Sequence, residues 1–383
     1  MGDAFPSFTF GDSYSPLGRN SLSEGLEGST VARNMLNWTR GKQLLKFGVE
    51  YRRIRSRSKD WSTSAGNYTF SNQGTALPTS LSNTGDSYAS FLLGQTATAS
   101  MSLPVQSEST RPYWGFFVQD DYRVTSRLTL NLGLRYEFTG APHEHNDQYS
   151  LVDLNVPNPA AGGRLGASVF AGKGEGHIGS SYLYNTDYSG IGPRFGFAWQ
   201  VAANTVVRGG YGLFYGGNDL DIVTTGYRTV ASHATLDQGV TPAFILEEGF
   251  PGSYSPNPVL TPAMLNGQNV TARSSSAPRM PRTQNWSLSV QRELNASWVA
   301  ELSYVANKAT RLSSPSMIND NQVDPRYLPL GSLLTQQVTS AAAVAAGIVK
   351  PYPDFTGSVA QALRPYPQYL TVTEQAAKAG SSF

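Results

Sequence analysis

The sequence contains no cysteine, so disulfide bonds and thiolate metal sites are excluded. It also lacks long hydrophobic runs, and no stretch approaches the ~18 consecutive apolar residues of a membrane-crossing helix. The first residues, MGDAFPSFTF, contain no basic segment followed by an apolar core, so no secretory signal peptide is recognised. Charged residues are scarce, at 15% of the chain, below the usual share in soluble domains. The net charge of +2 gives no strong attraction for nucleic acid.

Aromatic residues and turn formers are abundant by contrast. Aromatic residues make up 11% of the chain, with 20 Tyr, while Gly and Pro number 38 and 23. A chain of 383 residues is long enough for one large barrel or for a few ordinary domains. Many turns combined with little charge are expected of a barrel whose outer face excludes charged side chains.

The clearest pattern is an unbroken alternation from Leu128 to Phe138. Leucine and aromatic side chains point one way and mostly polar ones the other, a period of two that predicts a β-strand. The run is long enough for a tilted membrane-crossing strand of roughly 9–11 residues, whereas ordinary strands have about 5–6. Its polar face carries Arg135 and Glu137. An apolar core would not accept them unpaired, but a water-filled lumen would.

The same strand–turn–strand unit is predicted four times, with a turn of a few residues each time. The predicted hairpins pair 30–40 with 44–55, 113–122 with 128–138, 192–200 with 205–216, and 283–294 with 298–310. Long polar segments separate them: 56–84, with a short strand at 68–71, then 141–190 and 217–280. Residues 86–103 predict a helical turn followed by a strand.

These patterns divide the chain into an N-terminal loop at 1–29, a partial barrel at 30–312, and an extended, partly helical region at 313–383. In the last region, 327–338 and 340–348 have helical composition, and no closing strand is recognised after them. The predicted fold class is all-β, an antiparallel transmembrane β-barrel of which about ten strands are present. Barrels combine long extracellular loops with short periplasmic turns, whereas compact soluble domains rarely hold such loops.

Four segments resemble the β-barrel of TonB-dependent outer-membrane receptors. They are FFVQDDYRVTSRLTLNLGLRYE (116–137), GPRFGFAW (192–199), VVRGGYGLFYG (206–216) and QNWSLSVQREL…ELSYVANKATRL (284–312). More closely, they are similar to the Oar-like branch, whose members carry a carboxypeptidase-regulatory-like N-terminal domain. Weaker similarities at 44–53, 89–94, 321–331 and 361–369 extend the resemblance over residues 30–369.

The resemblance implies a barrel of roughly 22 strands closed around an N-terminal plug. It also implies a location in the cell outer membrane of a Gram-negative bacterium and uptake powered by the TonB complex. Relative to that pattern the sequence has no recognisable plug, TonB box or closing strand, so we expect a fragment from the middle of the barrel. The implied partners are outer-membrane lipid, the TonB complex through a plug missing from this chain, and an unknown extracellular ligand, with no nucleic acid.

Alternation within the predicted strands assigns side chains to two faces. One face is expected to line the lumen: Lys46, Glu50, Arg52, Asn131, Arg135, Glu137, Arg194 and Arg208. The other is expected to face lipid or the interface: Phe47, Tyr51, Leu130, Leu132, Leu134, Tyr136, Phe195, Phe197, Trp199, Trp286 and Leu288. We expect Arg135 and Glu137 to bridge lumen charges or to contact a plug, with a substrate role as the alternative.

Three further motifs resemble metal-binding, phosphate-binding or catalytic sites, but each has a simpler explanation. The His-Glu-His tripeptide at 143–145 offers potential metal ligands, but its position just past a strand end favours coincidence. The segment Gly172–Gly176 superficially resembles a phosphate loop without the flanking strand and helix that such a loop needs. Adjacent Asp120 and Asp121 point to opposite faces of a strand, so they cannot share a proton as a catalytic pair. We therefore predict no enzyme activity, no cofactor and no metal site.

The favoured hypothesis is a fragment of a TonB-dependent receptor that takes up a siderophore, a glycan or a peptide. A small plug-less outer-membrane porin or adhesin is the first alternative, and it requires a closing strand. A secreted β-sandwich protein is the second. A sandwich should be soluble without detergent, whereas a barrel fragment should pellet or need detergent.

Overall fold

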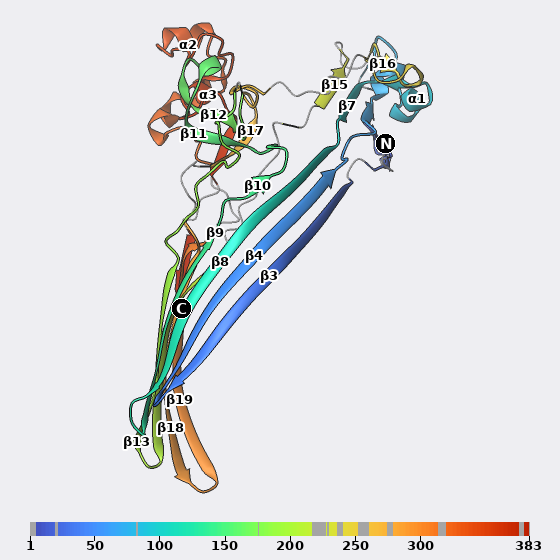
Figure 1. Cartoon of the computed structure of the whole chain (residues 1–383). Coiled ribbons are helices and arrows are strands. Elements are labelled where there is room, and N and C mark those ends of the chain that lie inside the picture. Colours follow the sequence, from blue (N-terminus) through green and yellow to red (C-terminus); the bar gives the residue numbers. More distant parts are fainter. Residues whose placement is uncertain are drawn as a thin grey trace.

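One open antiparallel sheet of ten strands forms the body of the protein in the computed structural model (Figure 1). The structure describes residues 5–19, 22–81, 83–174, 176–216, 227, 230–235, 240–251, 260–273, 279–312, 319–374 and 379–382. The long strands form four hairpins: β3 (Ser23–Arg40) with β4 (Gln43–Asp60), β8 (Val105–Arg123) with β9 (Leu128–Thr139), β13 (Ile191–Ala202) with β14 (Thr205–Tyr215), and β18 (Arg282–Asn295) with β19 (Trp298–Leu312).

The order of the strands follows the chain, as in an up-and-down barrel. It runs β21-β19-β18-β14-β13-β9-β8-β4-β3, with β21 (Ala379–Ser382) on one edge and β10 (His143–Glu144) added beside β8. Among the described residues no pairing joins β3 to β21, so the sheet is not closed. No helix in the described ranges is long and apolar enough to cross a membrane.

The turns within the four hairpins are short and lie together at one end of the sheet (Figure 1). The turn between β3 and β4 has two residues, and its Gly41 has φ +60°. Glycine adopts this left-handed conformation without the steric cost that a side chain brings. The connections at the opposite end are long, and they build two lobes.

The first lobe, here called the aromatic lobe, contains a small sheet in the order β15 (Val230–Ala234), β7 (Thr98–Ser102), β5 (Asn67–Phe70), β1 (Ser7–Phe10) and β2 (Leu17–Gly18). Around it lie η1 (Asn72–Thr75), α1 (Ser87–Leu92), the pair β6 (Gln95–Thr96) and β16 (Phe244–Ile245), and η4 (Leu246–Glu248). Its core is almost entirely aromatic, formed by Phe10, Tyr68, Phe70, Ala99 and Phe244.

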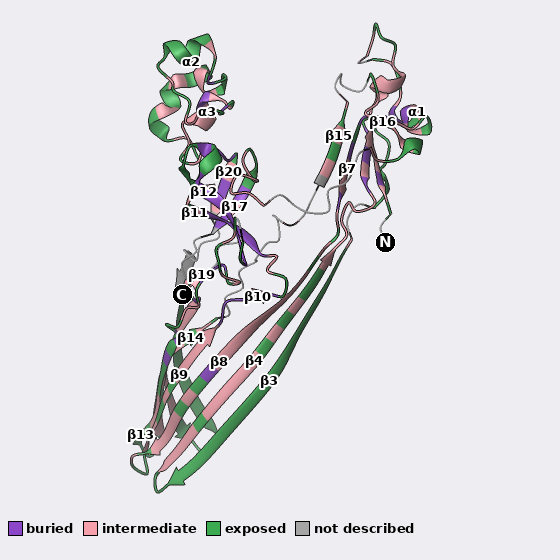
Figure 2. Ribbon diagram, turned by 45° about the horizontal axis from the view of Figure 1, so that its top comes forward, coloured by how far each residue is buried: buried purple, intermediate pink, exposed green. Residues whose placement is uncertain are grey.

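The second lobe, here called the helical lobe, contains a sheet in the order β12 (Arg164–Phe170), β11 (Ser150–Asn158), β17 (Asn269–Arg273) and β20 (Thr371–Glu374). It also holds η2 (Pro159–Ala161), η5 (Pro325–Thr335), α2 (Ala341–Ala345) and α3 (Val359–Ala362). The buried residues of the molecule gather in the two lobes, whereas the long strands are mainly intermediate or exposed (Figure 2). The large sheet therefore has no core of its own.

The four predicted hairpins, the short strand near 68–71 and the helical turn near 86 are all confirmed. The apolar face of the large sheet is exposed rather than packed on a second sheet, so the β-sandwich alternative does not fit this fold.

Several predicted boundaries are wrong. Residues 1–29 are not a loop, because β1 and β2 lie there and β3 already begins at Ser23. The segment 141–190 contains β10, β11 and β12, and the segment 217–280 contains β15, β16 and β17. The chain also returns to the large sheet through β21, and Phe383 lies outside the described residues. β15, β16 and β17 pair with strands far away in the sequence, which a local pattern does not reveal. β11 and β12 instead form a local hairpin that the sequence analysis missed.

Candidate functional site

Strand register assigns the predicted site residues to two faces of the large sheet. Residues directly opposite each other in neighbouring strands share a face, and Glu50 of β4 lies opposite Gly115 of β8, which lies opposite Glu137 of β9. Alternation then extends this face, here called the charged face, along every long strand. All residues expected to line the lumen lie on the charged face, and all those expected to face lipid lie on the opposite, apolar face.

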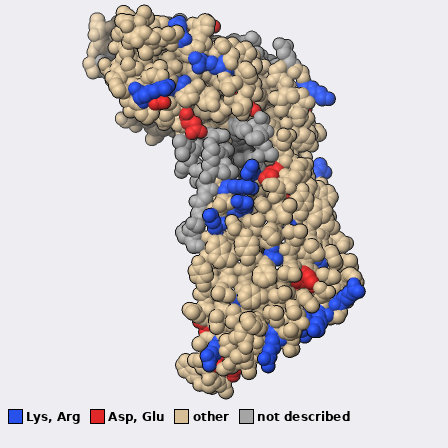
Figure 3. Space-filling model, turned by 90° about the vertical axis from the view of Figure 1, so that its left-hand side faces the viewer, with Lys and Arg blue, Asp and Glu red and all other residues tan. Residues whose placement is uncertain are grey.

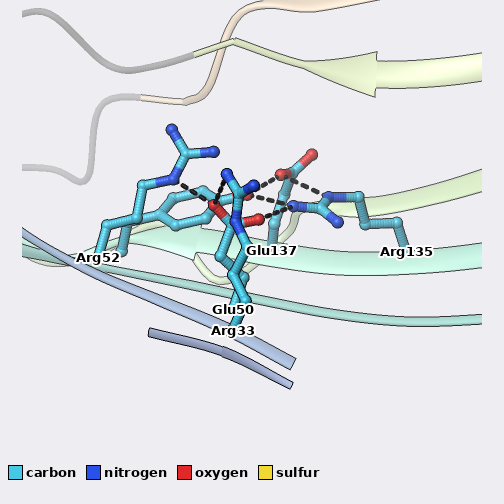
Figure 4. Close-up of polar contacts among 6 residues, drawn as sticks. Arg33, Glu50, Arg52, Arg135 and Glu137 are labelled. Carbon is cyan, nitrogen blue, oxygen red and sulfur yellow. Dashed lines mark hydrogen bonds and ion pairs between the residues drawn. The ribbon is translucent and has the colours of Figure 1, made fainter. Parts of the chain in front are cut away.

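Glu50 is the centre of an ion-pair network on the charged face (Figure 4). Its carboxylate accepts from Arg33 Nη2 at 3.2 Å and from Arg52 Nε, and its Oε2 lies 3.6 Å from Arg135 Nη2. Glu50 and Arg135 are mostly buried, with side-chain exposures of 12% and 17%. Three guanidinium groups from three strands therefore share one carboxylate.

Glu137 continues the network on β9. Arg135 Nε donates to its carboxylate at 2.9 Å, and the Tyr113 hydroxyl also donates to it. Arg135 Nη2 in turn donates to the Tyr113 oxygen at 2.7 Å, and the Arg52 guanidinium lies over the Tyr113 ring at 5.2 Å. Each side chain in this cluster has at least one polar partner from another side chain, so the network links strands β3, β4, β8 and β9.

Gly115 lies at the middle of the network, where a side chain would displace its neighbours. A Cβ on Gly115 would lie 2.7 Å from Arg135 Nη2 and 3.0 Å from the Tyr113 hydroxyl oxygen. Sequence reasoning placed Glu50, Arg52, Arg135 and Glu137 on one face but did not select Arg33, Tyr113 or Gly115. The positions of these three residues in the network depend on the register between neighbouring strands. The alternation within a single strand does not reveal that register.

A second cluster lies on the same face, nearer the short turns. The Asp121 carboxylate accepts from Lys46 Nζ at 2.7 Å, from Asn131 Nδ2 at 2.8 Å and from Gln119 Nε2 at 2.9 Å. The neighbouring Asp120 lies on the apolar face and accepts from Gln43 Nε2 at 2.8 Å. The two carboxylates do point apart, and they cannot act as a proton-sharing pair.

Two further cations of the charged face have no carboxylate partner among the described residues. The Arg194 guanidinium lies 4.7 Å from the centre of the Phe214 ring, and Arg208 Nη1 donates to Gln291 Oε1 at 2.7 Å. Neither charge is neutralised, so this part of the face is suited to an anionic partner.

The apolar face carries an aromatic ladder across β4, β8 and β9: Tyr51, Trp114, Phe116, Tyr136 and Phe138. Consecutive ring centres in the ladder lie 4.7–6.4 Å apart. Below it, Leu132 and Leu134 are 43% and 46% exposed. At the end with the short turns, the same face carries Trp38, Trp199 and Trp298, all exposed. An apolar band between two aromatic rows is typical of a surface in contact with lipid.

Charged side chains are sparse over the strand body on the side drawn in Figure 3. This agrees with the low share of charged residues in the sequence, at 15%.

The tripeptide at 143–145 is structural. Glu144 is fully buried, and its carboxylate accepts from the backbone N–H groups of Glu108, Asn146 and Gln148 at 3.0, 2.7 and 2.8 Å. These donors occupy the oxygens that a metal ion would need. No group of three metal-ligating side chains is found in the described part of the chain.

The aromatic lobe is fastened by Asp86, which caps α1. Its Oδ1 accepts from the backbone N–H groups of Ala89 and Tyr88 at 3.0 and 2.8 Å, and its Oδ2 accepts from the Tyr14 hydroxyl at 2.8 Å. The backbone hydrogen bond from Ala89 and the bond from Tyr14 lower the pKa of the Asp86 carboxyl below its ordinary value. The same Tyr14–Asp86 bond raises the pKa of the Tyr14 hydroxyl.

The helical lobe contains a cavity of about 170 Å³ between β11, β12 and β17, lined in part by Ser150, Phe170 and Met264. Small-molecule sites usually enclose roughly 300–1,000 Å³, so this cavity is too small for a siderophore. Nearby, burial raises the pKa of the Tyr369 hydroxyl to about 12. This hydroxyl donates to the Gly166 carbonyl at 3.1 Å and thereby helps to close the lobe.

Comparison with known proteins gives one match over the full chain. A family model described as "Outer membrane beta barrel domain" matches residues 1–383. No curated protein matches the chain.

Several solved structures are similar at low identity. The outer membrane transporter YddB from Escherichia coli has 13% identity and a TM-score of 0.40, over 98% of this chain and 33% of that one. The siderophore receptor PirA from Acinetobacter baumannii has 10% identity and a TM-score of 0.36, over 98% and 36%. The ferric yersiniabactin uptake receptor FyuA from Yersinia pestis has 9% identity and a TM-score of 0.34, over 79% and 32%. The chain thus spans about a third of the length of these structures, and the family assignment rests on the family model alone.

Proposed function

The chain belongs to the outer membrane beta-barrel domain family, and we propose that it forms part of a TonB-dependent receptor that takes up an extracellular ligand. Its location is the cell outer membrane. The finer assignment, to the Oar-like branch of these receptors, is part of the proposal and is supported by the sequence segments at 116–137, 192–199, 206–216 and 284–312.

One observation carries the proposal: a charged, largely paired face lies back to back with an apolar face on the same strands. Side chains such as Glu50 and Arg135 are tolerated in a membrane protein only where they face water or a protein partner. We infer that the charged face lines a lumen and the apolar face contacts lipid. The lumen surface then presents the Glu50 network and the unneutralised Arg194 and Arg208 to whatever occupies the barrel.

The direction across the membrane follows from the lengths of the connections. Barrels of this kind have short periplasmic turns and long extracellular loops. The two lobes therefore lie outside the cell, where they are the first parts of the chain to meet a ligand. Siderophores, glycans and peptides are all candidate ligands, because the cavity described in the helical lobe is too small to select one of these classes.

The occupant of the lumen is a plug domain in this proposal. A plug that carries acidic side chains would be held by Arg194 and Arg208, while the Glu50 network, whose two carboxylates are both paired, would form a fixed wall beside it. We also propose that the chain is not an enzyme, because the carboxylates of the network are engaged by guanidinium groups rather than free to accept a proton.

Energy dependence tests the proposal against its main alternative. Cells that carry the whole protein are supplied with a labelled candidate ligand, and uptake is measured with and without a protonophore. A TonB-dependent receptor should stop accumulating ligand when the proton gradient collapses, although surface binding should persist. A plug-less porin should pass the ligand equally well under both conditions, and an adhesin should bind it without uptake.

A further inference from the structure

A row of cations lies on the apolar face, beyond its aromatic ladder. Past Tyr51 the strand β4 continues as RRIRSRSK, and its pairing with β8 runs without a shift from Gln43 to Asp60. Residues two apart on a strand share a face. The residues that share the face of Tyr51 in this segment, here called the basic strip, are Arg53, Arg55, Arg57 and Lys59.

The basic strip begins where the lipid-facing band ends. At a rise of about 3.3 Å per residue, Arg53 lies roughly 7 Å beyond Tyr51 along the strand and Arg57 about 20 Å beyond it. Tyrosine and tryptophan side chains lie at the level of lipid headgroups, and Tyr51 packs on Trp114 with ring centres 4.7 Å apart. The first cations of the strip are therefore at or just above the headgroups, on the side of the lobes.

The cations nearest the aromatic ladder are the ones without carboxylate partners. Arg57 pairs with Glu108 at 2.8 Å, and Lys59 lies opposite Glu24 in the register of β3 and β4. Arg53 and Arg55 are exposed, and no ion pair or hydrogen bond of their side chains is found within the described ranges, although Arg55 interacts electrostatically with Glu108 at longer range. Their closest cross-strand neighbours on this face are Thr30, Gly28, Pro112 and Thr110, none of which carries charge.

We propose that Arg53 and Arg55 bind the phosphate groups of phosphorylated lipid headgroups in the leaflet on the side of the lobes. A guanidinium group offers a planar fork of donors that matches the oxygens of a phosphate. The strip is continuous with the lipid-facing band, so its occupant arrives with the membrane and not from the lumen. This inference rests on the orientation of the faces given under the proposed function, but not on ligand uptake.

The test is a lipid-binding titration of the full chain in detergent micelles, read by native mass spectrometry, with lipid A as the probe. The variant Arg53→Gln/Arg55→Gln is expected to bind lipid A roughly ten- to thirtyfold more weakly than the wild type. Lipid A stripped of its phosphates should bind the wild type as weakly as intact lipid A binds the variant. The variant Arg53→Lys/Arg55→Lys should recover part of the affinity, which excludes misfolding as the cause.

Matched variants separate the possible failures. Arg127→Gln/Arg292→Gln removes two exposed cations near the short turns and should bind lipid A like the wild type. Equal binding by wild type and Arg53→Gln/Arg55→Gln would overturn the inference and leave the uptake proposal intact. If the variant Arg194→Gln/Arg208→Gln lost lipid A binding and the variant Arg53→Gln/Arg55→Gln kept it, the orientation of the two faces would be reversed. Full displacement of lipid A by millimolar inorganic phosphate would mean a site for free anions, which also contradicts the inference.

Discussion

Glu50 of β4 and Arg135 of β9 approach to 3.6 Å across the strand that separates them, and Gly115 of β8 is the residue that leaves the space for this contact. A larger residue in the middle strand would force the two side chains apart. The contact therefore depends on Gly115, which has no side chain and makes no side-chain interaction of its own.

Gly115→Ala is expected to displace the Arg135 guanidinium, because the new Cβ would lie 2.7 Å from its Nη2. The clash involves the end of a flexible side chain, so we expect the backbone to stay in place and the loss of stability to be about 1 kcal/mol. Thermal unfolding in detergent, followed by circular dichroism, measures this loss. Gly28→Ala in β3 is the control, since no atom lies within 4 Å of its added Cβ. Equal effects of the two substitutions would contradict the packing argument.

Arg135→Gln is expected to destabilise the sheet by about 1–3 kcal/mol, because it leaves two carboxylates, Glu50 and Glu137, in a mostly buried position. Glu137→Gln alone should cost less, since Arg135 keeps its contact with Glu50. In a double-mutant cycle the pair Arg135→Gln/Glu137→Gln should be more stable than the sum of the single changes predicts. Additivity in that cycle would show that the network is no more than a set of surface charges.

The large sheet was predictable because its information is local. A period of two, a short turn and a second period of two identify each hairpin from about thirty consecutive residues. Face assignment follows from the same alternation, which is why Arg135 and Leu134 were placed on opposite faces correctly relative to each other.

The lobes and the network were not predictable in this way. β17 pairs in parallel with β20. The hydroxyl oxygens of Thr271 and Thr373 lie 3.4 Å apart, although the two residues are 102 positions apart in the sequence. No periodicity in the segment 217–280 or 313–383 indicates such a partner. Similarly, the importance of Tyr113 and Arg33 depends on the register between strands, which is fixed only when the sheet is assembled.

The aromatic lobe is expected to loosen in acid through Asp86. Hydrogen bonds to its ionised form hold the folded-state pKa below the unfolded value of about 3.9. The ionised Asp86 carboxylate therefore stabilises the aromatic lobe fully at a pH above the unfolded-state pKa. This stabilisation is lost as the pH falls through the lower folded-state pKa. Limited proteolysis of the lobe between pH 2 and 7 should show faster cleavage at the acid end. Asp86→Asn keeps a capping side chain without the titration, so its cleavage rate should lack this acid-dependent rise.

The absence of cysteine makes the orientation of the two faces directly measurable. Asn131 and Leu132 are neighbours on β9 and lie on opposite faces, so Asn131→Cys and Leu132→Cys form a matched pair at nearly the same depth. In lipid vesicles a fluorophore on Leu132→Cys should be quenched by brominated lipid tails, and one on Asn131→Cys by iodide in the water. The opposite result would place the ion-pair network against the membrane and remove the basis for a lumen. Quenching of both positions by iodide alone would mean that this part of the sheet is not inserted in the membrane. The same pair of variants would then be measured in the whole protein.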